Sequence, residues 1–275
     1  MEPLKYSCSP LELELLQKVT LPLNHCSIPS WLLASLGYQR HPIPLEIDGI
    51  NTWYPTLCQM LQTLKTSSER AAYFDHFMTL RFGLNTKQAP IHDEVSQCRP
   101  SVNYRRLLLG WLFDSDNDQG AAWRSWVESR FGLLTLYHEH PVPSPESSEY
   151  LQFRKKCTRA IYNTNELYDQ LDLLYCFCQQ ELQLRYPNQD TLTLYRGCLD
   201  LPHYQIEHQS VWLFNNLSSF TIDEEAALRF GSKVFSVAVP LTKIACFDSL
   251  LPGRLAGEGE FMVLGGLYQA TRIRI

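Results

Sequence analysis

The sequence predicts an α+β fold, in which a mainly helical N-terminal region precedes a region of one long helix and several strands. Up to residue 139 the apolar residues recur at helical spacing, with little alternation of period two. Residues 140–148 then hold three prolines and three serines, a composition that excludes a helix and disfavours a central strand. After this stretch the strands are joined by loops with only one short helix among them, which disfavours a doubly wound parallel sheet.

Residues 1–148 are therefore expected to form a helical region that ends in the Pro/Ser-rich linker, and residues 149–275 to form the second domain. A chain of 275 residues is long enough for one large domain or two modest ones with real cores. Within the first region, hydrophobic spacing predicts helices over residues 11–19, 67–82 and 119–131.

The second region opens with a helix over about residues 166–186, whose apolar residues recur at the spacing of a single buried face. Asn163 and Glu166 have the spacing of a capping box at its start, and Pro187 stops the helix. Residues 191–196 then alternate as a strand, which places Arg196 on the same face as two leucines.

The remaining elements follow the same reasoning. Thr221 and Glu224 have the spacing of a second capping box, which predicts a short helix through residue 230 that Gly231 terminates. The residues just before it, 215–221, are mostly amides and hydroxyls, so Thr221 is favoured as the N-cap of that helix. Further strands are predicted over residues 234–239, 258–264 and 271–275.

Composition excludes several functional classes. Lys and Arg (24) do not outnumber Asp and Glu (29), so the net charge of −5 gives no basic surface for nucleic acid. A hydrophobic content of 45% is too high for a disordered chain. Uninterrupted apolar stretches reach about eight residues, well short of the roughly 18 that span a bilayer, and no export signal is recognisable at the N-terminus. Nine scattered cysteines predict reduced thiols and a cytoplasmic protein.

Common site motifs are missing from the sequence. We find no G-x-G-x-x-G after a strand, no P-loop, no H-E-x-x-H and no G-x-S-x-G, which disfavours Rossmann dehydrogenases, P-loop NTPases, zincins and α/β-hydrolases. His138 and His140 have no obvious third ligand nearby, so a solvated surface is favoured over a metal site, and no metal is predicted.

Two glutamates near the C-terminus carry the most chemical information. In an extended backbone Glu258 and Glu260 lie on one face, together with apolar residues that point inward. Such a pair raises the pKa of one of the two carboxylates, and carboxylates so placed commonly stabilise a sugar oxocarbenium ion or accept a proton. The alternative, that the strand begins at the surface and both glutamates are solvated, stays open.

Arg196 and Ser219 are the other candidates. Arg196 is followed at once by Gly197, where backbone can approach a ligand closely, and a guanidinium fork suits a phosphate or pyrophosphate. A structural salt bridge from Arg196 to one of the glutamates fits equally well. Ser219 has a hydroxyl available for a sugar or a carboxylate if Thr221 is the N-cap.

Taken in order, these segments resemble the Arg, Ser-x-Ser/Thr, Glu-x-Glu signature of arginine-directed mono-ADP-ribosyltransferases. More closely, most of the chain resembles the NAD-dependent dinitrogenase reductase ADP-ribosyltransferases, and the main departure from the general signature is a threonine where many relatives have serine. The signature segments are Leu194-Tyr-Arg-Gly197, Ser219-Phe-Thr221 and Glu258-Gly-Glu260, and the closer resemblance adds residues 110–114, 126–133, 213–221 and 257–266.

The resemblance implies a fold of two facing, mostly antiparallel sheets around an NAD cleft, with NAD as co-substrate. Arg196 would hold the NAD phosphates, and the backbone of Gly197 would face the nicotinamide amide. Thr221 and the loop that begins at Phe230 would complete the NAD site. Residues 247–257 would face the protein substrate.

The catalytic roles also follow from the resemblance. Ser219 would orient Glu260 and the nicotinamide ribose. Glu260 would bind the ribose 2′-hydroxyl and stabilise the oxocarbenium ion as nicotinamide leaves, while Glu258 would position and deprotonate the acceptor guanidinium. A guanidinium needs such a base because its pKa exceeds about 12.

The implied function is transfer of ADP-ribose from NAD to an arginine of dinitrogenase reductase, the nitrogenase iron protein, which reversibly inactivates nitrogen fixation. Members of the family are also controlled by PII-type nitrogen signal proteins, although nothing in this sequence marks that contact. Three alternatives stay open: transfer to an arginine of another intracellular protein, an NAD glycohydrolase that transfers ADP-ribose to water, and a catalytically silent binding module.

Overall fold

The N-terminal half of the protein is built from helices. The computed structural model describes residues 8–84, 102–113, 115, 117–135, 147–161, 166–251 and 259–273. The helices predicted over residues 11–19, 67–82 and 119–131 are confirmed as α1, α6 and α8. In chain order the helices up to residue 161 are α1 (Pro10–Val19), α2 (Ser30–Leu33), α3 (Leu36–Arg40), α4 (Ile50–Trp53), α5 (Pro55–Thr63), α6 (Ser67–Phe82), α7 (Tyr104–Phe113), α8 (Asp118–Phe131) and α9 (Ser148–Ile161).

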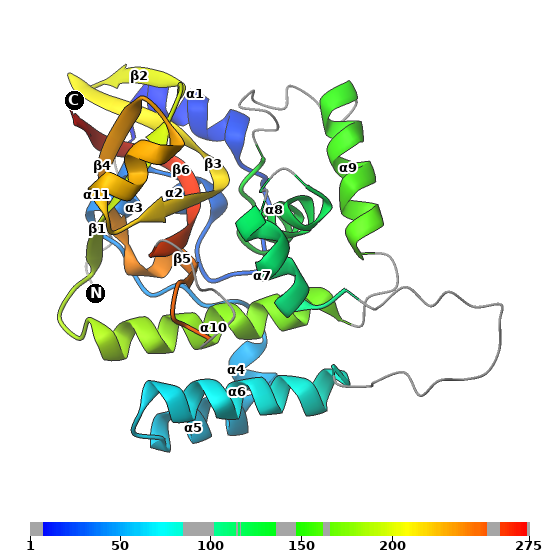
Figure 1. The fold of residues 1–275 in the computed structure, drawn as a ribbon. Helices are drawn as coiled ribbons and strands as arrows, with labels where there is room; N and C mark the ends of the chain where they lie inside the picture. The colour runs from blue at the N-terminus through cyan, green and yellow to red at the C-terminus, as the bar shows by residue number, and fades with distance from the viewer. Residues whose placement is uncertain are drawn as a thin grey trace.

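The second half begins with the long helix α10 and continues as an antiparallel sheet, which confirms the α+β class (Figure 1). Helix α10 ends before Pro187, as predicted, whereas Asn163 lies outside the described residues and Glu166 makes no side-chain cap. The elements are α10 (Leu167–Arg185), β1 (Thr191–Cys198), β2 (His203–Ile206), β3 (Gln209–Thr221), α11 (Glu224–Ala227), η2 (Leu228–Phe230), β4 (Lys233–Pro240), η3 (Leu241–Lys243), β5 (Ile244–Phe247) and β6 (Glu260–Ile273).

The strands of the described residues form one sheet that closes on itself. Its order is β2-β3-β1-β4-β6-β5, and β3 pairs with β6 as well as with β1. The resemblance implied two facing sheets, and among the described residues these are parts of one hydrogen-bonded sheet. This closure follows from β6, which bends at Gly265 and Gly266 opposite a bulge in β3, so that its first half pairs with β5 and its second half with β4. A side chain at Gly265 would collide with the backbone of Asn215.

Two sequence predictions are corrected here. Residues 215–221 belong to the long strand β3, and the N-cap of α11 is Asp223, whose Oδ1 accepts hydrogen bonds from the N–H groups of Glu225 and Ala226. The hydroxyl of Thr221 instead accepts from the N–H of Asp223, one step before the helix. The separate strand predicted over residues 271–275 is also corrected, because residues 271–273, the part that the structure describes, form the end of β6.

A single cluster of buried apolar side chains connects the helical half to the sheet. It includes Leu16 of α1, Phe74 of α6, Trp123 of α8, Leu171 of α10 and Leu264 of β6. Helix α10 lies between the sheet and α4 to α6 (Figure 1). Residues 136–146 lie outside the described ranges, and the division into two domains near residue 148 stays a prediction.

Helices α6 and α10 are joined by a buried ion pair. Arg70 of α6 donates from Nε and Nη2 to the Glu181 carboxylate of α10, the second bond at 3.1 Å, and both side chains are buried. Nη1 of Arg70 also donates to the carbonyls of Leu64 and Lys65, so the guanidinium is held on several sides.

Glu181→Gln is expected to lower the free energy of unfolding by about 2 kcal/mol, because it leaves the buried Arg70 charge without a counter-ion. Urea unfolding followed by circular dichroism measures the change. The control is Glu14→Gln, which breaks an exposed pair with Lys18 and should change little. Equal effects of the two substitutions would contradict the importance of the buried pair.

Lys243 is fully buried in the core and forms no ion pair with the described residues. Its Nζ lies 4.2 Å from the centre of the Tyr268 ring and, among the described residues, makes no hydrogen bond. Burial lowers the pKa of Lys243 from the ordinary 10.5 to about 7. Between these pH values the unfolded chain binds a proton that the folded protein does not, so stability rises with pH from about 7 to about 10.5.

Lys243→Met is therefore expected to remove this rise and to stabilise the protein at pH 7 by about 2 kcal/mol. Unfolding in urea at pH 7 and pH 9.5 tests both parts, with Lys65→Met at an exposed position as the control. A loss of stability at pH 7 would mean that attraction between the charged amine and the Tyr268 ring outweighs the cost of burial.

Candidate active site

The candidate site lies where β1, β3 and β6 meet. Thr221, the last residue of β3, is paired with Tyr195 of β1 on one side and with Glu260, the first residue of β6, on the other. Ser219 lies two residues before Thr221 in β3. Because directly paired residues and residues two apart in a strand share a face, Ser219, Thr221 and Glu260 project from the same side of the sheet.

Glu260 is half-buried and contacts several polar groups. Its Oε1 accepts a hydrogen bond from Nε1 of Trp111, at 3.0 Å. Burial raises the pKa of Glu260 above its ordinary value, and hydrogen bonds from Ser219 and Trp111 and the nearby charge of Arg196 partly oppose that rise. The result is a partly desolvated carboxylate beside a cation, an arrangement that can stabilise positive charge on a bound molecule.

Arg196 is placed beside the same point by β1. Its Nη1 donates to the backbone carbonyl of Ser219 at 2.6 Å, and the guanidinium lies 5.8 Å from the centre of the Phe220 ring. These contacts hold the guanidinium against β3, where its charge lowers the pKa of Glu260. Its role in phosphate binding stays a prediction.

Gly197 is required by packing within the chain itself. A Cβ at Gly197 would collide with the carbonyl of Ala227, and a Cβ at Gly231 would collide with the backbone of Cys198. The end of β1 and the turn after η2 therefore lie backbone to backbone. Phe230, the last residue of η2, has 63% of its surface exposed beside this contact.

Glu258 lies outside the described residues. Strand β6 begins at Glu260, and Gly259 has a φ of 66°, in the left-handed region. The extended backbone that was expected to place Glu258 and Glu260 on one face therefore does not continue through Gly259, because a left-handed residue interrupts the alternation of side chains. The catalytic role of Glu258 stays a prediction.

Trp111 is the site residue that sequence reasoning missed. It lies in α7, and its Nε1 is 3.0 Å from Ser219 Oγ as well as from Glu260 Oε1. The only sequence signal is that Trp111 falls in the segment 110–114, which contributes to the family resemblance. No local pattern indicates that this indole reaches a strand more than 100 residues away.

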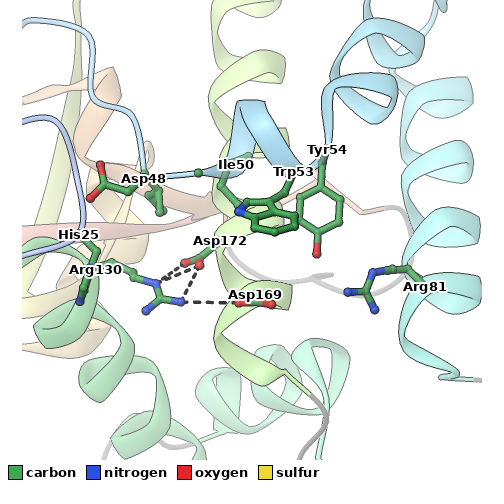
Figure 2. A pocket seen from close by; sticks show the side chains of 11 residues that line it. His25, Asp48, Ile50, Trp53, Tyr54, Arg81, Arg130, Asp169 and Asp172 are labelled. Carbon is green, nitrogen blue, oxygen red and sulfur yellow. Dashed lines mark hydrogen bonds and ion pairs between the residues drawn. The ribbon is translucent and has the colours of Figure 1, made fainter.

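A hollow of about 370 Å³ lies in the helical part of the molecule (Figure 2). Arg130 on its wall is paired with Asp172 at 2.8 Å and with Asp169 at 3.8 Å. None of the predicted site residues lines this hollow. It has no evident part in the chemistry at Glu260.

Other site types were also considered. Within the described residues there is no group of three or more His, Cys, Asp or Glu side chains placed to hold a metal ion, and His138 and His140 lie outside them. Across the same residues, we find no helix with the length and apolarity to cross a bilayer.

The structure brings Ser219 and Glu260 together at one end of the antiparallel sheet, with Arg196 in contact with the backbone of Ser219. These are the residues for which the sequence predicts an NAD-dependent ADP-ribosyltransferase site. The model of a family described as dinitrogenase reductase ADP-ribosyltransferase matches residues 23–272. The chain is 33% identical over 254 residues to the NAD(+)--dinitrogen-reductase ADP-D-ribosyltransferase of Rhodospirillum rubrum, covering 89% of this chain and 92% of that protein. No solved structure shows significant similarity to the chain.

The chain belongs to the dinitrogenase reductase ADP-ribosyltransferase family. This confirms the resemblance seen in the sequence. It also makes the chain an NAD-dependent transferase for which NAD is the co-substrate.

Proposed function

We propose that this protein transfers ADP-ribose from NAD to an arginine of dinitrogenase reductase, with release of nicotinamide and reversible inactivation of nitrogen fixation. The observation that carries the proposal is the half-buried Glu260 carboxylate, held beside Ser219 and Arg196 in a chain that matches its relative over 92% of the relative's length. That relative's name states dinitrogenase reductase as the acceptor.

The described residues fit NAD. Arg196 supplies a guanidinium for the pyrophosphate, and Gly197, Thr221 and Phe230 border the place where the nicotinamide half would lie. Ser219 orients Glu260, whose ionised carboxylate binds the ribose 2′-hydroxyl and stabilises the positive charge that develops on the ribose.

The reaction is a substitution at the ribose carbon that carries nicotinamide. The bond from that carbon to the nicotinamide nitrogen breaks, and nicotinamide leaves with the electron pair. A nitrogen of the acceptor guanidinium forms the new bond, and Glu258 accepts the proton that this nitrogen loses. Glu260 stabilises the positive charge on the ribose that develops after the bond to nicotinamide breaks and before the bond to the acceptor nitrogen forms.

Two further parts of the proposal rest on the resemblance. The protein would act in the cytoplasm, where dinitrogenase reductase is its protein partner. A PII-type nitrogen signal protein would control its activity.

Intact-mass analysis of dinitrogenase reductase after incubation with this protein and NAD tests the proposal. We expect a gain of one ADP-ribose, mapped to an arginine and absent with Glu260→Gln. Nicotinamide release without a mass change would refute the acceptor and indicate an NAD glycohydrolase or another target protein. Neither product, with a PII-type protein added as well, would indicate the silent binding module.

A further inference from the structure

Trp111 connects the helical N-terminal region to the proposed catalytic residues. Its single indole N–H lies 3.0 Å from Glu260 Oε1 and 3.0 Å from Ser219 Oγ, so both oxygens share one donor. The side chain is only 3% exposed, and its contacts span 108 and 149 residues of sequence. An indole nitrogen donates and never accepts, so this contact favours the ionised form of Glu260 over the protonated form.

The contact engages one oxygen of the carboxylate. This leaves the other oxygen of Glu260 to accept a hydrogen bond from a ribose hydroxyl. The hydroxyl of Ser219, held by the same N–H, is turned so that its own hydrogen is available to Glu260. One donor therefore sets the mutual orientation of both groups.

Helix α7, which carries Trp111, is anchored near both of its ends. At its start the N–H of Tyr104 donates to Gln170 of α10 at 3.0 Å, and the Tyr104 hydroxyl donates to Asp75 of α6 at 2.9 Å. Near its end the carbonyl of Gly110 accepts from Asn117 at 2.8 Å, at the N-cap of α8.

Helix α8 is in turn attached to the strand that carries Ser219. Asn216 of β3 donates to the carbonyl of Arg124 at 3.0 Å and to that of Leu133 at 3.1 Å. The guanidinium of Arg124 lies 5.5 Å from the centre of the Trp111 ring, where its charge is attracted to the π face and holds the ring plane. The position of the indole is thus fixed from α6, α8, α10 and β3.

We infer that Trp111 is a positioning residue of the transferase, whose indole N–H holds Glu260 and Ser219 in the orientation that the ribose requires. This inference rests on the proposed function, because it concerns the same glutamate. Helix α7 would then contribute to catalysis by positioning Glu260 and Ser219 through Trp111.

The contrasting role is purely structural, in which Trp111 fills space and its N–H is merely satisfied. Trp126 of α8 provides a matched control, since it is a buried tryptophan whose Nε1 donates to a different carboxylate, Asp172, at 2.6 Å. Trp126→Phe loses the same kind of bond away from Glu260. Trp111→Phe keeps an aromatic ring but removes the donor and part of the indole's volume, and Trp126→Phe loses the same volume at its own buried position.

The test is the pH dependence of nicotinamide release, with dinitrogenase reductase present as acceptor. For Trp111→Phe we expect a tenfold or larger fall in kcat, a KM for NAD within about threefold of wild type, and an acidic limb moved to higher pH. The shift follows because a donor that lowers the pKa of Glu260 is lost, while burial, Arg196 and Asp248 still act on that carboxyl. Trp126→Phe should keep the wild-type profile, whatever it does to stability.

A measurement on the unaltered protein keeps the inference testable if Trp111→Phe does not fold. The chain has six tryptophans, and one indole N–H resonance in a ¹H–¹⁵N spectrum should shift as Glu260 ionises. That shift should vanish in Glu260→Gln. The inference would be overturned if no indole resonance shifted with the ionisation of Glu260. It would also be overturned if Trp111→Phe had the wild-type kcat and pH profile. A wild-type protein that releases no nicotinamide would instead refute the proposed function.

Discussion

Glu260→Gln is expected to lower the rate of nicotinamide release from NAD about 1,000-fold. The substituted amide has nearly the same shape and can still accept the hydrogen bond of Trp111, but it carries no charge to stabilise the positive ribose carbon. Binding of NAD should weaken only a few-fold, because Arg196 is untouched. Chromatographic measurement of nicotinamide, with NAD affinity measured separately by calorimetry, distinguishes the two effects.

The matched control is Glu225→Gln, which neutralises an exposed carboxylate in the first turn of α11. It should retain wild-type activity, because the Glu225 side chain is exposed and its contact to Asp223 is made by its backbone N–H. If Glu260→Gln kept more than a tenth of the wild-type rate, the charge would have to come from another group and the assignment of Glu260 would be wrong.

The pH profile of the wild type provides a second check on Glu260. In the proposed mechanism the active form is the carboxylate, and burial raises the pKa of Glu260 above its ordinary value. Activity should therefore fall, as the pH is lowered, at a higher pH than the value of about 4.3 of a free glutamate. In Glu260→Gln the residual activity should lack this limb.

The helices were predictable because their signals are local. Helix α6 begins after Thr66, which forms a reciprocal capping box with Glu69, and it ends at Gly83 in a left-handed conformation. Helix α8 likewise ends at Gly132 with a left-handed cap. Such caps depend on a few adjacent residues, so hydrophobic spacing and cap residues together indicate where these helices begin and end.

Strand β3 was not predictable in the same way. Its residues 215–219 are mostly amides and hydroxyls, which locally favour a loop. They are extended because β6, about 40 residues further on, pairs with this part of β3, and because the Asn216 side chain donates to the carbonyls of Arg124 in α8 and of Leu133 just after it. A pattern confined to one segment does not contain these long-range contacts.

The site residues likewise divide into those that the sequence indicated and those that depend on long-range contacts. The order of Arg196, Ser219 and Glu260 in the sequence indicated their association through the family resemblance, and the sheet places them together. Thr221 was wrongly expected to cap a helix, because the capping-box spacing does not reveal that the strand continues to that residue. Trp111 had no local signal, since its partners lie in β3 and β6.

Glu258→Gln is expected to lower ADP-ribose transfer to arginine about 1,000-fold while nicotinamide release to water stays within a few-fold of wild type. The acceptor guanidinium is protonated at neutral pH and becomes a nucleophile only when a base takes its proton, whereas water needs far less activation at an oxocarbenium ion. Parallel assays of nicotinamide and of modified dinitrogenase reductase measure the two rates.

The two glutamates should therefore separate the two halves of the reaction, with Glu260→Gln losing both products and Glu258→Gln losing only the protein modification. Gly259, which lies between the two glutamates, has a φ of 66° and interrupts the alternation of an extended strand. The two proposed roles are compatible with this, because two carboxylates with different tasks need not lie on the same strand face. Unchanged transfer by Glu258→Gln would refute its role as the base. Equal loss of both products would instead mean that Glu258 acts on the ribose together with Glu260.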